Sequence, residues 1–124
     1  MKPLSIALLQ SDAGIARALC SSLCHHFHSI HAANTIDELR HAIAKQRVEV
    51  VIVDMERTTL PEIERLRREF SDICIVCTHR LADDEMWTAA LNAGVADMCS
   101  SLDTTSIVTA ALRNSTLQPR SVAA

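Results

Sequence analysis

Residues 48 to 53 form a run that is apolar at every position except Glu49, and Asp54 follows it directly. A strand that faces water on one side alternates between apolar and polar residues, whereas a strand covered on both faces is nearly continuously apolar. The run therefore predicts a strand in the middle of a sheet that has helices on both faces. It also predicts a carboxylate, that of Asp54, at the carboxyl end of this strand.

Short apolar runs and helical patterns alternate along the rest of the chain. The spacing of the apolar residues predicts strands at residues 4–9, 29–33, 48–53, 73–77 and 98–99, and helices at residues 13–24, 60–70, 84–93 and 104–114 and after Thr35. Thr35 and Glu38 have the spacing of a capping box, and Gly94 is a typical residue to end a helix. Five strands alternating with five helices predict an α/β fold with a doubly wound parallel sheet.

The length of 124 residues is that of one domain. We expect this domain to span residues 1–114. We expect residues 115–124, which contain Pro119, to form a linker or disordered tail, and a downstream effector domain is compatible with it.

The composition argues against two classes of function. The net charge is -3 without a basic stripe, and two Phe, one Trp and no Tyr leave few rings for base stacking, so we expect no direct nucleic-acid binding. The apolar runs are too short to cross a bilayer and no signal-peptide pattern is present, so we expect a cytoplasmic protein without membrane association. We expect the five cysteines, an odd number, to be reduced and mostly buried.

Polar residues follow four of the predicted strands. Open parallel sheets bind their ligands at the carboxyl ends of the strands, and this rule brings residues from distant parts of the sequence together. The candidate residues are Gln10, Ser11 and Asp12 after the first strand, Asp54 after the third, Thr78 after the fourth, and Ser100 and Ser101 after the fifth.

These residues resemble a known pattern. The chain is similar to the receiver domains of bacterial two-component response regulators in four features. They are the order of the elements, Asp54 at the end of the third strand, Thr78 at the end of the fourth, and the run Ala-Leu-Asn-Ala-Gly-Val-Ala-Asp at residues 90–97. The resemblance covers nearly the whole chain. It implies a flavodoxin-like fold whose five strands lie in the order 2-1-3-4-5.

The resemblance also implies roles for single positions. In that family an acidic pair after the first strand and the phosphoacceptor Asp hold Mg²⁺, a Thr or Ser bonds the phosphoryl group, and a Lys pairs with it. Asp54 falls on the phosphoacceptor and Thr78 on the hydroxyl position, whereas the acidic pair falls on Gln10 and Ser11 and the lysine on Ser101. Because Mg²⁺ prefers charged oxygen ligands, the resemblance implies a degenerate site with weak Mg²⁺ binding at most and no other cofactor.

Further positions depart from the family pattern. Met98 stands where the family usually has an aromatic residue, and Leu102 where it usually has Pro. A phosphoryl group on Asp54 would add roughly two negative charges without a metal or an ammonium to offset them. We therefore expect no ordinary phosphotransfer and no enzymatic activity.

Two acidic residues keep two interpretations each. Asp12 is expected either to help coordinate a cation, as a third acidic residue does in many receivers, or to cap the helix that starts near Ala13. Asp54 either has a present role or is a solvated carboxylate left from an ancestral site.

The segment from Cys20 to His31 is rich in residues that bind metals. It contains Cys20, Cys24, His25, His26, His28 and His31. Adjacent His25 and His26 diverge on a helix and no distant ligand pair completes a set, so a histidine-rich helix end is favoured over structural zinc. Cys74 and Cys77 lie three apart in a predicted strand, so their side chains point to opposite faces and do not form a redox pair.

Trp87 and Leu91 lie beside the inward-facing residues of the fourth predicted helix. In receivers, the fourth helix, the fifth strand and the fifth helix form a common dimer or partner face, and aromatic residues often dominate interface energies. We therefore expect Trp87, Leu91 and Met98 to contribute to a face that binds a protein partner or a second copy. Ordinary partial burial is the alternative.

The sequence supports three hypotheses. The first is an atypical receiver that acts as a phosphorylation-independent protein-protein interaction and signalling module. The second is a weakly phosphorylatable or ligand-responsive switch that uses Asp54. The third is a metal or redox sensor that uses the cluster from Cys20 to His31.

Overall fold

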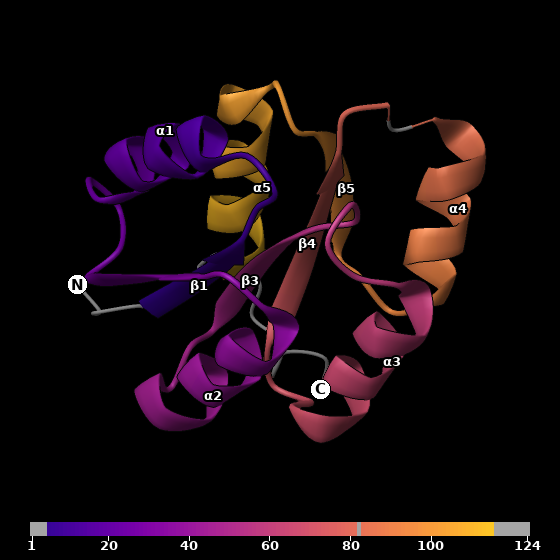
Figure 1. The fold of residues 1–124 in the computed structure, drawn as a ribbon, viewed down its shortest axis with the longest axis horizontal. Helices are drawn as coiled ribbons and strands as arrows, with labels where there is room; N and C mark the ends of the chain where they lie inside the picture. The colour runs from indigo at the N-terminus through magenta and orange to yellow at the C-terminus, as the bar shows by residue number, and fades with distance from the viewer. Residues whose placement is uncertain (1–4, 82, 116–124) are drawn as a thin grey trace.

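The computed structural model describes residues 5–81 and 83–115, which form one parallel sheet with helices on both faces (Figure 1). The strands are parallel and lie in the order β2-β1-β3-β4-β5. This confirms the predicted fold and strand order. The elements are β1 (Ser5–Leu9), α1 (Ala13–Leu23), β2 (Ser29–Ala33), α2 (Ile36–Gln46), β3 (Val50–Asp54), α3 (Leu60–Glu69), β4 (Cys74–His79), α4 (Asp84–Asn92), β5 (Asp97–Ser100) and α5 (Thr104–Ser115).

The third strand begins and ends later than the sequence predicts. Val48 and Glu49 precede β3, and Asp54 is its last residue instead of the first residue after it. Asp54 pairs with Thr78 on β4, and the Met55 N–H continues the ladder by donating to the Thr78 carbonyl over 2.8 Å. The carboxylate is therefore held in the sheet.

Two hydrophobic clusters cover the two faces of the sheet. Alternate residues of a strand point to opposite faces, and residues 50–53 of β3 are fully buried because both faces are covered. One cluster joins the sheet to α1 and α5, and the other joins it to α2, α3 and α4. This arrangement directs every second residue of the central strands toward α1 and α5.

The helix ends follow the sequence signals with one difference. Thr35 accepts a hydrogen bond from the Glu38 N–H, as predicted, but the Glu38 carboxylate accepts from the Asn34 N–H. A complete capping box, which the sequence analysis missed, lies at the start of α3 between Thr59 and Glu62. The chain turns after α4 at Gly94, whose φ of 103° favours glycine.

The predicted tail lies almost entirely outside the described residues. Ser115 is the last residue of α5, one residue beyond the predicted end of the helix, and residues 116–124 are not described. None of the helices within residues 5–81 and 83–115 is both long enough and apolar enough to cross a membrane.

Candidate functional site

Four polar side chains are buried at the carboxyl ends of the strands. Asp54 and Thr78 lie two positions after Ile52 and Val76 on their strands, so their side chains point to the same face of the sheet, the one covered by α1 and α5. Gln10 follows β1 and Ser101 follows β5, and the exposed fractions of the four are 9% for Gln10, 1% for Asp54, 0% for Thr78 and 1% for Ser101. The structure thus brings four of the predicted site residues to one edge of the sheet.

Both carboxylate oxygens of Asp54 accept hydrogen bonds from the protein itself. Oδ2 accepts from the Ser11 backbone N–H over 3.0 Å and from the Ser11 hydroxyl over 2.6 Å. Oδ1 accepts from the Glu56 backbone N–H over 2.9 Å. Hydrogen bonds to a charged acceptor are short and strong, so these three donors hold the carboxylate in place.

Gln10 connects β1 to β4 above the end of β3. Its Nε2 donates to the Thr78 hydroxyl over 3.3 Å. Gln10 Oε1 and the Ser101 hydroxyl are both buried and have no hydrogen-bond partner within the described part of the chain. Gln10 and Ser101 are neutral residues, and each leaves one buried polar atom unsatisfied.

Asp12 caps α1. Its Oδ1 accepts from the Gly14 N–H over 2.7 Å and from the Ile15 N–H over 3.1 Å, and its backbone is extended. Asp12 is exposed. Its geometry is that of a helix cap, the second of the two interpretations drawn from the sequence.

An ion pair that the sequence analysis missed links the loop after β3 to the loop after β4. Arg80 donates to Glu56 through Nη2 over 2.9 Å and through Nε over 3.2 Å. The hydrogen bond from Arg80 lowers the pKa of Glu56, and the same bond raises the pKa of Arg80, with smaller contributions from Asp12 and Asp54. The expectation that site residues lie at the carboxyl ends of the strands could have found this pair, because Glu56 lies two positions after the end of β3 and Arg80 one position after the end of β4.

Of the three residues predicted to form an interface, two are exposed. Trp87 and Leu91 are each 45% exposed on α4. Met98 is only 6% exposed and belongs to the hydrophobic cluster beneath α2, α3 and α4, so its assignment to an exposed interface was wrong. The alternation of side chains along β5 turns Met98 inward, toward the same cluster as Cys77 on β4.

The segment rich in Cys and His does not form a compact ligand set. Cys24, His25, His26 and His28 are exposed, whereas Phe27 between them is buried against α1. Within residues 5–81 and 83–115, no three Cys, His, Asp or Glu side chains are grouped so that they could hold a metal ion.

The cysteines of the sheet are packing residues in this geometry. Cys77 is buried and Cys74, three positions earlier on β4, is partly exposed. Burial raises the pKa of the Cys77 thiol to about 12 and that of Cys99 to about 11. Thiols with such pKa values are poor nucleophiles, because the thiolate is the reactive form.

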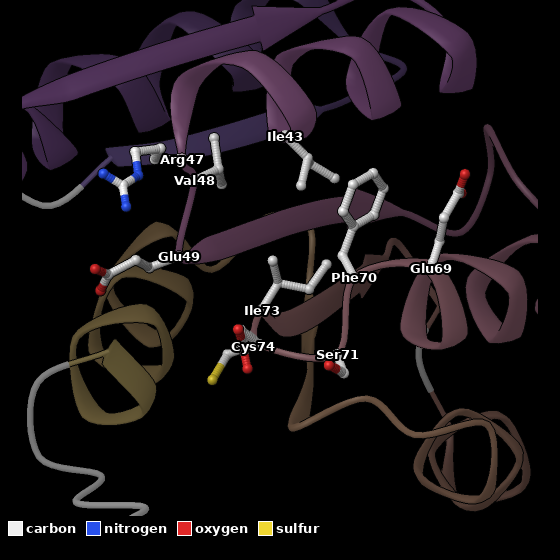
Figure 2. Close-up of a pocket in the computed structure, with 10 residues that line it drawn as sticks. Ile43, Arg47, Val48, Glu49, Glu69, Phe70, Ser71, Ile73 and Cys74 are labelled. Carbon is white, nitrogen blue, oxygen red and sulfur yellow. The ribbon is translucent and has the colours of Figure 1, made fainter.

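A cavity of about 580 Å³ lies at the opposite edge of the sheet, between the ends of α2 and α3 (Figure 2). The side chains of Ile43, Val48, Phe70 and Ile73 form its apolar part, and Arg47 and Glu49 lie at its rim. It adjoins the amino-terminal ends of β3 and β4. It is therefore separate from the residues around Asp54.

Comparisons with known proteins give matches among solved structures only. No protein-family model and no curated protein matches the chain. The N-terminal signal receiver domain of a two-component response regulator from Bacteroides fragilis is 18% identical, with a TM-score of 0.83 over 93% of this chain and 98% of that chain. The signal receiver domain of an HD domain-containing protein from Pseudomonas fluorescens Pf-5 is also 18% identical, with a TM-score of 0.82 over 97% and 99%.

A third match is an atypical orphan response regulator. It is 12% identical, with a TM-score of 0.79 over 90% of this chain and 94% of that chain. Identities this low support the fold alone, and the strand order agrees with it. The chain therefore has the flavodoxin-like fold of a response-regulator signal receiver domain.

Proposed function

We propose that the chain is a receiver-like signalling module that acts by binding protein partners without a phosphorylation cycle, and that it is not an enzyme. One observation carries this proposal: the carboxylate at the phosphoacceptor position, that of Asp54, is buried and already accepts hydrogen bonds from Ser11 and Glu56. A phosphoryl group or a metal ion would compete with these donors for the carboxylate oxygens.

The other site residues support the same proposal. Mg²⁺ favours several hard, charged oxygen ligands in octahedral geometry. Here the amide of Gln10 is bonded to Thr78, the hydroxyl of Ser11 is bonded to Asp54, and Asp12 is engaged in capping α1. These groups do not fit the ion, and we expect no Mg²⁺ binding at millimolar concentration.

A neighbouring structure is compatible with this mode of action. The atypical orphan response regulator is described as having a phosphorylation-independent regulatory mechanism. We propose that this chain likewise works through its surface, in the cytoplasm, and that Trp87 and Leu91, which we call the Trp87 face, contact a protein partner or a second copy. Two half-exposed apolar side chains one helical turn apart are suitable anchors for such a contact.

The first test is a titration with Mg²⁺ followed by beryllium fluoride, a mimic of the phosphoryl group. Trp87 fluorescence and amide NMR shifts of Asp54 and Thr78 are followed together. We expect neither signal to saturate at millimolar concentrations. Saturation with a joint shift of the strand-end amides would contradict the proposal and favour a switch that uses Asp54.

The chain offers a matched control in which the missing charges are restored. The variant Gln10→Asp, Ser11→Asp, Ser101→Lys supplies the acidic pair and the lysine and removes the hydroxyl that bonds Asp54. We expect this variant to bind Mg²⁺ and beryllium fluoride with saturation. If only the variant binds Mg²⁺ and beryllium fluoride, the lack of binding by the native chain is due to these three positions.

A further inference from the structure

A groove of about 390 Å³ separates the start of α4 from the start of α3, on the side of α4 away from the Trp87 face. We call it the α3–α4 groove. Its apolar lining includes Met55, Leu60 and Met86, which are partly buried and pack against the core. The full lining is Met55, Leu60, His79, Asp83, Glu85, Met86 and Ala89.

The rim of the groove carries three carboxylates at the start of α4, where Asp83 caps the helix by accepting from the Met86 N–H. Asp83, Asp84 and Glu85 are consecutive and exposed, and Asp83 and Glu85 line the groove. Within the described ranges, none of these three side chains is in an ion pair with Lys or Arg. The nearby Arg80 is already paired with Glu56.

The two loops beside the groove are tied to each other and to the Asp54 site. Glu56 follows β3 and Arg80 follows β4, and their ion pair connects the two loops. The Glu56 N–H in turn donates to the Asp54 carboxylate. Glu56 and Arg80 are therefore tied to each other before any partner binds, which lowers the entropic cost of ordering these two side chains.

We propose that the α3–α4 groove binds a partner-protein segment that carries a Leu or Met side chain flanked by Lys or Arg. The apolar side chain would contact the methionines and Ala89, whose unbranched and small side chains adapt to different shapes. The flanking cations would face Asp83, Asp84 and Glu85, and this complementarity disfavours anionic ligands such as nucleic acids and phosphopeptides.

Neighbouring features support a contact that extends beyond the groove. Leu81, in the same connection as Arg80, is 77% exposed and offers further apolar area to such a segment. The α3–α4 groove and the Trp87 face lie on different sides of α4, because Met86 and Ala89 line the groove while Trp87 and Leu91 do not. Binding at the α3–α4 groove thus goes beyond the proposed function, and the proposed function can be correct even if the groove binds no partner.

The test uses a fluorescein-labelled peptide with the core Lys-Arg-Leu-Arg-Lys and measures fluorescence anisotropy with the full chain. One control peptide has Ser in place of Leu and keeps the charge, and a second has Glu in place of the cations and keeps the Leu. We expect saturable binding of the first peptide and at least about tenfold weaker binding of both controls, because each lacks one half of the contact.

Two variants of the chain locate the site. Ala89→Leu fills the groove without changing the charge, and Glu85→Lys reverses one charge at the rim. We expect each to weaken binding about tenfold. Glu64→Lys, an equal charge change on the exposed side of α3, and Trp87→Ala, on the other side of α4, are expected to change binding less than about twofold.

Three results would overturn the inference. They are no binding of the Leu peptide at millimolar concentration, equal binding of the Ser peptide, or equal weakening by Glu64→Lys and Glu85→Lys. Circular dichroism checks that Ala89→Leu is folded, and Glu85→Lys, at an exposed position, tests the site independently. The Mg²⁺ and beryllium fluoride titration does not involve the groove, so its result separates failure of the proposed function from failure of this inference.

Discussion

The Asp54 site and the surface of α4 differ in what a ligand can reach. Asp54 is 1% exposed and its carboxylate is engaged by three donors, whereas Trp87 and Leu91 are 45% exposed and face outward. In the first region internal hydrogen bonds engage the Asp54 carboxylate, and in the second region two apolar side chains are half exposed to solvent. The contrast indicates that the potential for new contacts lies on the surface of the molecule.

The largest expected effect comes from removing the acceptor at the centre of the buried site. Asp54→Ala leaves the Ser11 N–H, the Ser11 hydroxyl and the Glu56 N–H without their partner. We expect the free energy of unfolding to fall by about 2–4 kcal/mol, measured by urea denaturation.

Two variants calibrate this result. Asp54→Asn keeps the shape and one carbonyl oxygen, so we expect a smaller loss. Asp84→Ala removes an exposed carboxylate and is expected to change the stability by less than about 0.5 kcal/mol. If Asp54→Ala were no more destabilising than Asp84→Ala, the two regions would not differ as described.

The next effect isolates one of the three donors. Ser11→Ala removes the hydroxyl that lies 2.6 Å from Asp54 but keeps the backbone donor. We expect a loss of about 1–2 kcal/mol in the free energy of unfolding, because a hydrogen bond to a charged group contributes more than a neutral one.

Ser101→Ala is the matched control for Ser11→Ala. The same group, a serine hydroxyl, is removed, but that of Ser101 is buried and has no partner among the described residues, whereas Ser11 is exposed and bonded to Asp54. Removing it is expected to leave the stability unchanged or slightly increased, because an unsatisfied buried polar group is itself costly. A clear loss in Ser101→Ala would show that this hydroxyl has an important partner.

A smaller, pH-dependent effect is expected at the ion pair between the two regions. Arg80 lowers the pKa of Glu56 below its ordinary value of 4.5 in the folded chain, so the unfolded chain binds more protons near that pH. The pair therefore stabilises the fold above pH 4.5, and this contribution is lost as the pH falls through the lowered pKa.

Arg80→Met tests this effect. We expect the Glu56 carboxyl to titrate at a higher pH in the variant, as measured by carbon NMR of the side chain. We also expect the difference between the two chains to shrink at high salt, because the pair is partly exposed. Identical titration of Glu56 in both chains would contradict the role given to Arg80.

The smallest effect on stability is expected at the Trp87 face. Trp87→Ala should change the free energy of unfolding by no more than about 0.5 kcal/mol, because the side chain is half exposed. If a second copy binds this face, sedimentation velocity will show less self-association in the variant. Met98→Ala, at a buried position, should instead reduce the stability of the monomer by about 2 kcal/mol or more.

The sequence by itself determined the fold class, because the periodicity of apolar residues within each short segment predicts whether that segment is a strand or a helix. The apolar run before Asp54 required a strand covered on both faces, and the alternation of runs and helical periods required a doubly wound sheet. The strand-end rule also gathered Gln10, Asp54, Thr78 and Ser101, since it depends only on where strands end.

Only the tertiary structure decided how these residues are used. The bonds from Ser11 to Asp54 join residues that are distant in sequence, and no local pattern encodes them, whereas the bond from the Glu56 N–H is local. The burial of Met98 and the pairing of Arg80 with Glu56 likewise depend on which face and which loop the neighbouring strand presents. A hydrogen bond needs correct distance and direction between both partners, and those are fixed only when the elements are packed together.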